Sequence, residues 1–474
     1  MCVDEKFILR KRRPNGLQYI VYFFAQIASM VTRIKNYLYK PIPSTQLGLF
    51  RILFGICLTY ELFYYFSIDL LNKGLRAPAM RFPYEGFEWV KLLPGKSMEV
   101  ILFLLLIAAV CIALGAIYRI ATIFFCTFFA YIFFIDKSLY NNHLYLFVLL
   151  CFLLIVTKGD AALSLNKKKQ TASIPQWQLL IFRIQVFIVY FYGGLAKINA
   201  DWLLRHEPMH QLLQLSGYTS SATESMLVYG GLLFDLSIGF LLWFKRTRII
   251  GIIGVLFFNI SNAIIFNDIG VFPFFMILST VLFFEPEVIH QFITKNQTGK
   301  KKDAKQKIQP IAFASNNQTT LLLAFYLAFQ LVFPFRYLLF PGNVDWYGVG
   351  QRFSWRMKIQ NRELTELQFT VVDYAHKELM DLDPEKYLTT AQLQALKLDP
   401  KMILQFANFL EEDANKKGLK GVGVKAKVKV TFNGHAEQYI VSPETDFTKI
   451  NYHPFDLRNW VLPLQNEKIV DSQK

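Results

Sequence analysis

The spacing of apolar residues is the feature that most constrains the fold of this 474-residue chain. Apolar residues come in blocks of about 20 up to roughly residue 340, where the blocks stop. A helix of about 20 residues crosses the roughly 30 Å hydrocarbon core of a bilayer. The sequence therefore predicts a polytopic α-helical membrane domain of about nine spans, followed by a small, mostly-β domain outside the membrane.

Composition supports a membrane protein. Hydrophobic residues make up 53% of the chain and charged residues 18%, against roughly 25% charged residues in soluble domains. We expect a basic N-terminal region over 1–45, a membrane domain over 46–340 and an external domain over 341–474. The predicted spans are 46–66, 97–118, 120–135, 142–157, 178–196, 224–243, 247–266, 270–285 and 319–340.

The positive charges indicate the orientation of the spans. If the basic segment 6–13 is cytoplasmic, alternation places the basic clusters at 167–169, 245–248 and 300–307 on the same side. The net charge of +16 is therefore read as a topology signal, and we expect no nucleic-acid partner. The N-terminus is predicted to be cytoplasmic and the C-terminal domain to be external.

Two further features concern the ends of the chain. Segment 17–33 is apolar with basic flanks, which favours an interfacial helix lying along the membrane; an additional span is the alternative.

The chain has five cysteines, and none follows Cys151, so a disulfide framework in the C-terminal domain is excluded.

The C-terminal region changes to alternating, β-branched sequence. Segments 350–359 and 366–373 are predicted strands, and 400–416 is a predicted amphipathic helix. Segment 422–432 alternates almost perfectly and is followed by Asn433-Gly434, which predicts a β-hairpin.

Lys197 is the strongest candidate for chemistry. It lies at the external end of an apolar span and is followed by Asn199, Asp201 and Trp202. A lysine that snorkels toward the lipid headgroups is the structural alternative. Gly193 and Gly194 favour a site, because they let a helix or ligand approach the backbone closely. In a dry pocket an amine loses affinity for its proton and becomes a usable base.

Other polar residues lie at the same external level. His143 follows Asn141 and Asn142 at the start of a span, and Asn262, Asn267 and Asp268 lie near the end of another. A satisfied polar contact is the alternative for a lone histidine.

Charged residues inside spans must be paired or line a cavity. We expect Asp235 to pair with Arg51 or Arg183, with a role in a substrate cavity as the alternative. His206 and His210 have the i,i+4 spacing of a metal pair, but Pro208 lies between them and no third ligand is near, so we expect no metal site.

Six segments in order resemble vitamin K-dependent gamma-glutamyl carboxylase. They are LGLFRILFG (47–55), DKSLYNNHLYL (136–146), FRIQVFIVYFYGGLAKINADW (182–202), GGLLFDLSIGFLL (230–242), FNDIGVFPF (266–274) and WYGVGQRFSWRM (346–357). The similarity extends to RNWVLPL at 458–464. The chain resembles the short, bacterial-type members with the horizontally transferred transmembrane (HTTM) domain.

The resemblance implies a reaction and a set of residues. Reduced vitamin K (or menaquinol) is oxygenated to the epoxide, and the strong base so formed removes a γ-proton from a peptidyl glutamate, which then takes up CO2. Lys197 matches the family's base and His143 its essential histidine. Tyr140, Asn141, Asn142, Trp202, Asn262 and Trp355 are expected to line the quinol or substrate site. No metal is implied.

The resemblance also shows departures. Asn259 stands where a family histidine is expected, and the disulfide of the vertebrate enzymes has no counterpart. The expected partners are membrane lipid and a glutamate-containing exported peptide. The expected location is a bacterial inner membrane, with the C-terminal domain in the periplasm. Two alternatives stay open: a quinol oxygenase or epoxidase without carboxylation, and a non-catalytic membrane binding protein.

Overall fold

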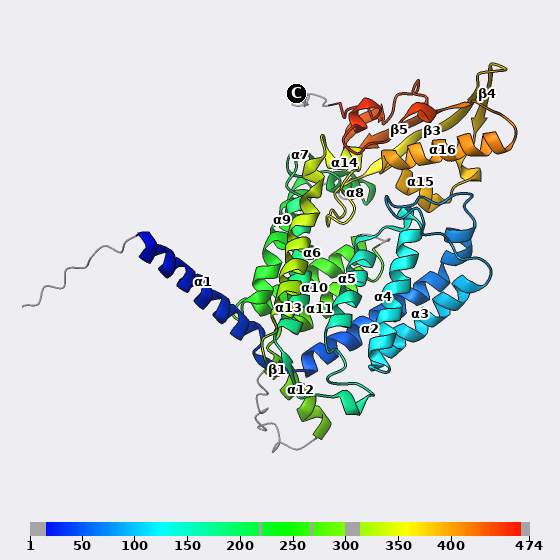
Figure 1. Cartoon of the computed structure of the whole chain (residues 1–474). Helices are drawn as coiled ribbons and strands as arrows, with labels where there is room; N and C mark the ends of the chain where they lie inside the picture. The colour runs from blue at the N-terminus through cyan, green and yellow to red at the C-terminus, as the bar shows by residue number, and fades with distance from the viewer. Residues whose placement is uncertain (1–15, 218–219, 266–268, 299–312, 466–474) are drawn as a thin grey trace, which may run out of the picture.

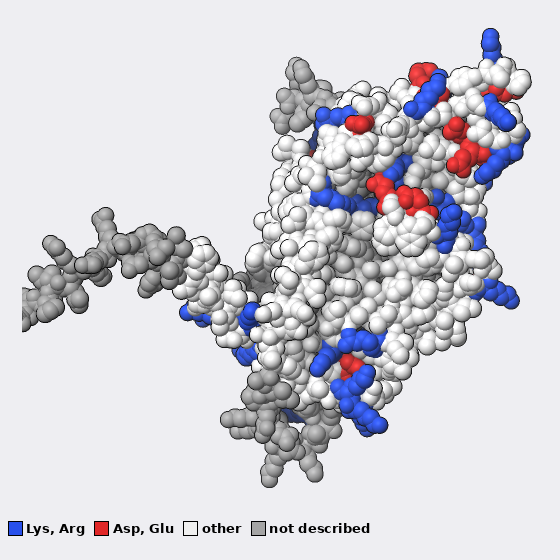
Figure 2. All heavy atoms as spheres, in the orientation of Figure 1, with Lys and Arg blue, Asp and Glu red and all other residues white. Residues whose placement is uncertain are grey.

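The computed structural model describes residues 16–217, 220–265, 269–298 and 313–465. A bundle of apolar helices is followed by a C-terminal domain built on a four-stranded antiparallel sheet, which lies over one end of the bundle (Figure 1). On the visible face, Figure 2 shows a belt of the bundle almost free of charged side chains, between charged zones at its two ends. The predicted fold class is confirmed.

Among the residues that the structure describes, seven helices are long and apolar enough to cross a membrane. They are α2 (Thr45–Ser67), α3 (Ser97–Leu114), α4 (Tyr118–Ile135), α6 (Trp177–Ala196), α9 (Ser221–Trp243), α10 (Arg248–Ile265) and α13 with its 3-10 continuation (Asn317–Leu339). The bent pair formed by α11 (Phe272–Ser279) and α12 (Pro286–Thr298) adds an eighth if it counts as one span.

The two remaining predicted spans are helical but short. Helix α5 (Asn142–Val156) has 15 residues, which is about 22 Å of helix and less than the hydrocarbon core. Helix α11 continues as a 3-10 turn to Phe283, and the chain then bends by 99° into α12. Both lie beside other helices of the bundle, α5 against α4 and α11 against α2 and α10.

Phenylalanine rings fill the centre of the bundle. Phe54 of α2 packs against Phe147 of α5 at 5.3 Å and Phe275 of α11 at 5.7 Å between ring centroids. Phe50 of α2 contacts Phe182 of α6 at 5.1 Å. These edge-on and tilted contacts join four helices through dispersion and quadrupole interactions.

The buried arginines are bound differently from the prediction. Arg51 donates to the carbonyl oxygens of Ile112 and Ala113, at the C-terminal end of α3, and Arg183 donates to those of Leu282 and Phe284. Carbonyls at helix ends lack intrahelical partners and carry partial negative charge, so they satisfy a guanidinium without a carboxylate. The expected pairing of Asp235 with an arginine is therefore wrong.

Helix α1 (Gly16–Leu38) leaves the bundle and projects away from it (Figure 1). Its apolar side chains, Phe23, Phe24, Ile27 and Met30 among them, are exposed. Lys35 near its end donates to Asn317 at the start of α13 at 2.8 Å. An exposed apolar face with basic neighbours is the surface that an interfacial helix presents to a membrane.

The C-terminal sheet has the strand order β4-β3-β5-β6. Its strands are β3 (Arg362–Asp373), β4 (Glu378–Leu382), β5 (Gly423–Phe432) and β6 (His435–Tyr439), and α16 (Pro400–Lys416) packs on β5. Asn433 and Gly434 both have positive φ, 43° and 71°, which is the two-residue hairpin turn that the sequence predicts.

The predicted strand at 350–359 is wrong. This segment is a series of turns with positive φ at Phe353, Trp355 and Lys358. Its alternation arises because Trp355 is buried against the membrane domain, where its ring lies 4.9 Å from that of Tyr145 on α5. Local alternation was therefore a consequence of tertiary packing and not of a sheet.

The loop between α2 and α3 joins the two halves of the molecule. Met80 and Phe82 are buried in the core of the C-terminal domain. The amide of Lys137, which follows α4, donates to the Phe82 carbonyl at 2.8 Å. Gln392 of α15 (Thr390–Leu396) donates to Asp136 at 2.8 Å and to the Met80 carbonyl at 2.9 Å.

Candidate active site

Lys197 caps the C-terminal end of α6 and forms an ion pair with Asp235 of α9. The lysine is 8% exposed and the aspartate 5% exposed. The ammonium also lies 5.2 Å from the ring centroid of Trp202 and 5.8 Å from that of Phe258. A buried charge is stable only when it is paired, so the two side chains depend on one another.

Gly193 and Gly194 bring α6 and α9 close enough for this pair. A Cβ at position 194 would lie 2.8 Å from side-chain atoms of Leu236 and 2.9 Å from its backbone nitrogen. A Cβ at position 193 would lie 3.4 Å from Asp235 Oδ2 and 3.3 Å from Met357. The two glycines therefore provide a close approach of helix and side chains at the site, as the sequence predicts.

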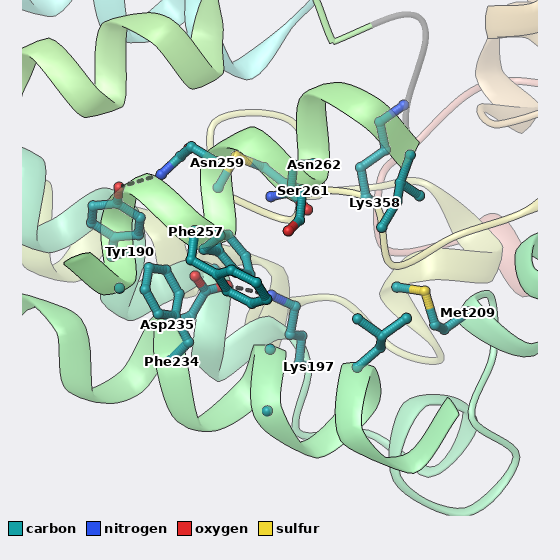
Figure 3. Close-up of a pocket in the computed structure, with 18 of the residues that line it drawn as sticks. Tyr190, Lys197, Met209, Phe234, Asp235, Phe257, Asn259, Ser261, Asn262 and Lys358 are labelled. Atoms are coloured by element: carbon teal, nitrogen blue, oxygen red, sulfur yellow. Dashed lines mark hydrogen bonds and ion pairs between the residues drawn. The ribbon is translucent and has the colours of Figure 1, made fainter. Parts of the chain in front are cut away.

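The pair lies in the wall of a cavity of about 290 Å³. Helices α6, α9, α10 and α11 contribute most of its lining, which is largely apolar and includes Phe258. Figure 3 shows the rings of Phe234 and Phe257 beside Lys197 and Asp235. Phe257 and Met226 line the cavity and are 64% and 61% exposed. These two residues therefore place one side of the cavity at the faces of α10 and α9 that are not covered by protein.

Asn259 is a polar group at the inner end of the cavity. Its side-chain amide is buried and donates to Tyr190 Oη at 3.2 Å and to the Val255 carbonyl at 2.9 Å (Figure 3). Asn259 occupies the position where the resemblance expects a histidine, and it keeps a hydrogen-bonding group there. The sequence contained a signal for it, because a polar residue inside an apolar span is rarely neutral to function.

Three of the predicted site residues line this cavity: Lys197, Trp202 and Asn262. Trp202 belongs to the short helix α7 (Ala200–Leu204), and its indole nitrogen donates to the Val228 carbonyl at 3.0 Å. The neighbouring Asn267 and Asp268 lie outside the described residues.

His143 lies one aromatic ring away from the cavity. Its imidazole is 6.3 Å from the ring of Phe272, which lines the cavity. Its Nε2 is buried without a hydrogen bond among the described residues and lies 3.6 Å from a carboxylate oxygen of Glu61 on α2. Glu61 is 3% exposed. Glu61 was not predicted as a site residue, although an acidic residue inside an apolar block is itself a signal.

The other predicted residues form a cluster beside His143. Asn141 caps α5 by accepting from the His143 amide at 3.3 Å, and the Tyr140 hydroxyl donates to Asn142 at 3.0 Å. The Phe353 amide donates to Tyr140 Oη at 2.6 Å. Trp355 is fully buried, and its indole nitrogen has no hydrogen bond among the described residues. This cluster fixes the turn segment of the C-terminal domain against α5.

His206 and His210 are joined by a shared carboxylate. Both Nδ1 atoms lie near Glu224, at 2.6 Å and 2.7 Å. In the described part of the chain, no group of three histidine, cysteine, aspartate or glutamate side chains has the arrangement of a metal site.

The arrangement suits proton transfer in a dry site. An amine and a carboxylate in contact can exchange a proton without changing their net charge. The surrounding apolar wall keeps water away and strengthens their interaction. The apolar wall suits an apolar ligand, and the buried amine and carboxylate suit a ligand that exchanges a proton.

Comparison with known families covers most of the chain. Residues 39–287, more than half of the sequence, match the family model described as HTTM domain. Residues 315–467 match the model described as vitamin K-dependent gamma-carboxylase, lumenal domain. No solved structure matches the chain.

Proposed function

The chain belongs to the vitamin K-dependent gamma-carboxylase family, and from this premise we propose that it carboxylates glutamate side chains of exported peptides while oxidising reduced vitamin K or menaquinol. The observation that carries the proposal is the buried Lys197–Asp235 pair in an apolar cavity beside the lipid. O2 and CO2 are the proposed co-substrates.

The topology agrees with such a function. The apolar helices indicate a multi-pass membrane protein, and the lumenal-domain match indicates a C-terminal domain on the extracytoplasmic side. We propose that the N-terminus is cytoplasmic and that the membrane is a bacterial inner membrane, with the C-terminal domain in the periplasm. The cavity then lies at the periplasmic level, where an exported peptide is present.

The cavity fits a quinol. Its aromatic and aliphatic wall matches a fused-ring head group, and its exposed side at Met226 and Phe257 admits a ligand that arrives within the bilayer. Lys197, Asn259 and Asn262 provide polar groups for the ring oxygens. When bound, reduced vitamin K supplies the oxygen-dependent chemistry that generates a base strong enough to take the γ-proton of glutamate.

In this proposal Lys197 Nζ is the atom that accepts a proton. Asp235 holds the amine in place and takes up the ammonium proton at Oδ2 beforehand, so that a neutral amine faces the cavity. Trp202 and Phe258 exclude water and stabilise the cation that Lys197 becomes. A positioned base of this kind contributes about 10²–10⁴-fold to a rate.

We propose a supporting role for His143 and its neighbours. Its Nε2 stands free of a protein hydrogen bond in the described chain, and Glu61 lies near enough to hold the ring and stabilise a positive charge on it. Tyr140, Asn141 and Asn142 fix the start of α5, and Trp355 fixes the C-terminal domain above it.

The test is an assay of the purified protein in lipid nanodiscs, with reduced vitamin K, O2, labelled bicarbonate and a glutamate peptide. We expect epoxide and labelled peptide in equal amounts. Epoxide without labelled peptide would select the oxygenase alternative. Quinone or peptide binding without oxygen consumption would select the non-catalytic alternative and overturn the proposal.

A further inference from the structure

A second cavity, of about 330 Å³, lies where the membrane domain meets the C-terminal domain. Figure 2 shows basic and acidic side chains gathered at this level of the visible face. Four cationic side chains line the cavity, Lys137, Arg336, Arg352 and Lys401, against two carboxylates, Glu85 and Asp399. The lining described therefore carries an excess of two positive charges.

The two carboxylates are already engaged by the other cations. Asp399 lies 2.5 Å from Arg352 and 3.2 Å from Lys137, and Glu85 lies 2.5 Å from Lys401. Burial lowers the pKa of Lys137 to about 8 in spite of Asp399. The described lining holds more cations than carboxylates, and an added anion would be stabilised there.

Arg336 differs from the other three cations of the lining because no carboxylate of the described residues pairs with it. In the described chain its guanidinium forms no ion pair. It donates to the Phe333 carbonyl, to Ser354 Oγ at 3.1 Å and to the Arg352 carbonyl. A guanidinium has five N–H groups, so two remain for a ligand. The ring of Phe333, 4.3 Å from the guanidinium carbon, holds the group flat against the cavity wall.

A short segment connects this cavity to the Lys197 cavity. Arg352 and Phe353 line the cationic cavity, and Met357 and Lys358 line the other. Met357 lies five positions after Arg352, and an extended chain spans at most about 18 Å over five positions. A peptide that occupies both cavities would therefore place its two groups within about five residues of one another.

We propose that the cationic cavity binds a second acidic side chain of the peptide whose glutamate reacts at the Lys197 cavity. This inference rests on the proposed function, and it adds that the substrates carry two carboxylates within about five residues. A carboxylate is a planar acceptor that a guanidinium binds with two parallel hydrogen bonds. An anionic lipid headgroup has related chemistry, and Leu338 and Leu339 beside Arg336 are exposed to the lipid side. The charge excess and the short link to the reaction cavity favour the peptide.

The test compares peptides that have one reacting glutamate and, at one to six residues from it, either a second glutamate or a glutamine. Binding of fluorescently labelled peptides to the full chain in neutral-lipid nanodiscs is measured by anisotropy, and KM is measured by incorporation of labelled bicarbonate. We expect the second glutamate to improve both Kd and KM on the order of 10-fold at a preferred spacing, with kcat unchanged.

The variant Arg336→Gln is expected to bring the ratio between the two peptides close to one. Arg76→Gln is the matched control, because Arg76 is an external arginine that pairs with Glu99 away from both cavities. Equal affinities of the wild type for the two peptides would overturn the inference. So would a preference that survives Arg336→Gln, or competition by phosphatidylglycerol with no difference between the peptides. If the protein binds the two-glutamate peptide more tightly than the glutamine peptide but forms no labelled product, that result would count against the proposed function alone.

Discussion

Lys197 and Asp235 each stabilise the charge of the other within the membrane domain. Among the side chains described around the cavity, Asp235 is the carboxylate that contacts the lysine. Removing one partner of a buried ion pair leaves an uncompensated charge, whereas replacing both with apolar groups is often neutral.

We therefore expect Asp235→Asn to destabilise the protein by about 3–5 kcal/mol and to reduce activity. The double variant Lys197→Met with Asp235→Leu should regain most of the stability and none of the activity. Thermal unfolding of the purified variants in the same detergent measures the first effect. A double variant as unstable as the single one would show that the pair is not the source of the loss.

The residues of this site differ in how far the sequence could identify them. Lys197 was identified because Gly193 and Gly194 precede it and polar residues follow it at the end of an apolar span. The partner of Asp235 was predicted wrongly, because it depends on the rotation of α6 and α9 about their axes. Glu61 and Asn259 were visible as polar residues in apolar blocks, but their approach to His143 and Tyr190 depends on helix packing.

At the scale of elements, the contact between α6 and α9 depends on a glycine. An added Cβ at Gly194 would meet the backbone nitrogen of Leu236 at 2.9 Å, and backbone moves only with its helix. The helices must then separate, which also increases the distance between the Lys197 ammonium and the Asp235 carboxylate.

Gly194→Ala is accordingly expected to cost about 1–3 kcal/mol of stability and to lower activity together with it. Gly230→Ala on α9 is the control for stability, since a Cβ there meets nothing within 4 Å. It should be neutral or slightly stabilising, because alanine favours helix. If both variants unfold at the wild-type temperature, the close packing of the two helices does not limit stability.

Elements with a strong internal pattern were predictable. The apolar blocks, the amphipathic helix α16 and the Asn-Gly hairpin of β5 and β6 follow from local sequence. Segment 350–359 was not, because Phe353 and Trp355 point toward membrane helices and adopt positive φ. The short helix α5 and the break between α11 and α12 also depend on neighbouring helices.

For the whole molecule, Asp399 links the C-terminal domain to the membrane domain. It lies at the start of α16 and pairs with Lys137, which follows α4. Burial alone would raise the pKa of Asp399, but Lys137 and Arg352 outweigh burial and lower it below its usual 3.8. A carboxyl group with a lowered pKa stabilises the folded state above its unfolded pKa, and this stability is lost as the pH falls below that value.

We expect the two domains to stay docked between about pH 5 and 8 and to loosen below about pH 4. Hydrogen exchange of the α15 amides, which lie at the junction, measures docking. Asp399→Asn should increase exchange already at neutral pH, because it leaves Lys137 and Arg352 buried together. Loosening of the wild type between pH 6 and 7 would instead implicate another group.

The proposed carboxylation requires Lys197 as its base. The most direct measurement is incorporation of labelled bicarbonate into a glutamate peptide by the nanodisc-embedded wild type, Lys197→Ala and Lys73→Ala. Lys73 is an exposed lysine between α2 and α3. We predict a rate per folded protein about 10²–10⁴-fold lower for Lys197→Ala and a wild-type rate for Lys73→Ala. Equal rates for all three proteins would contradict the account.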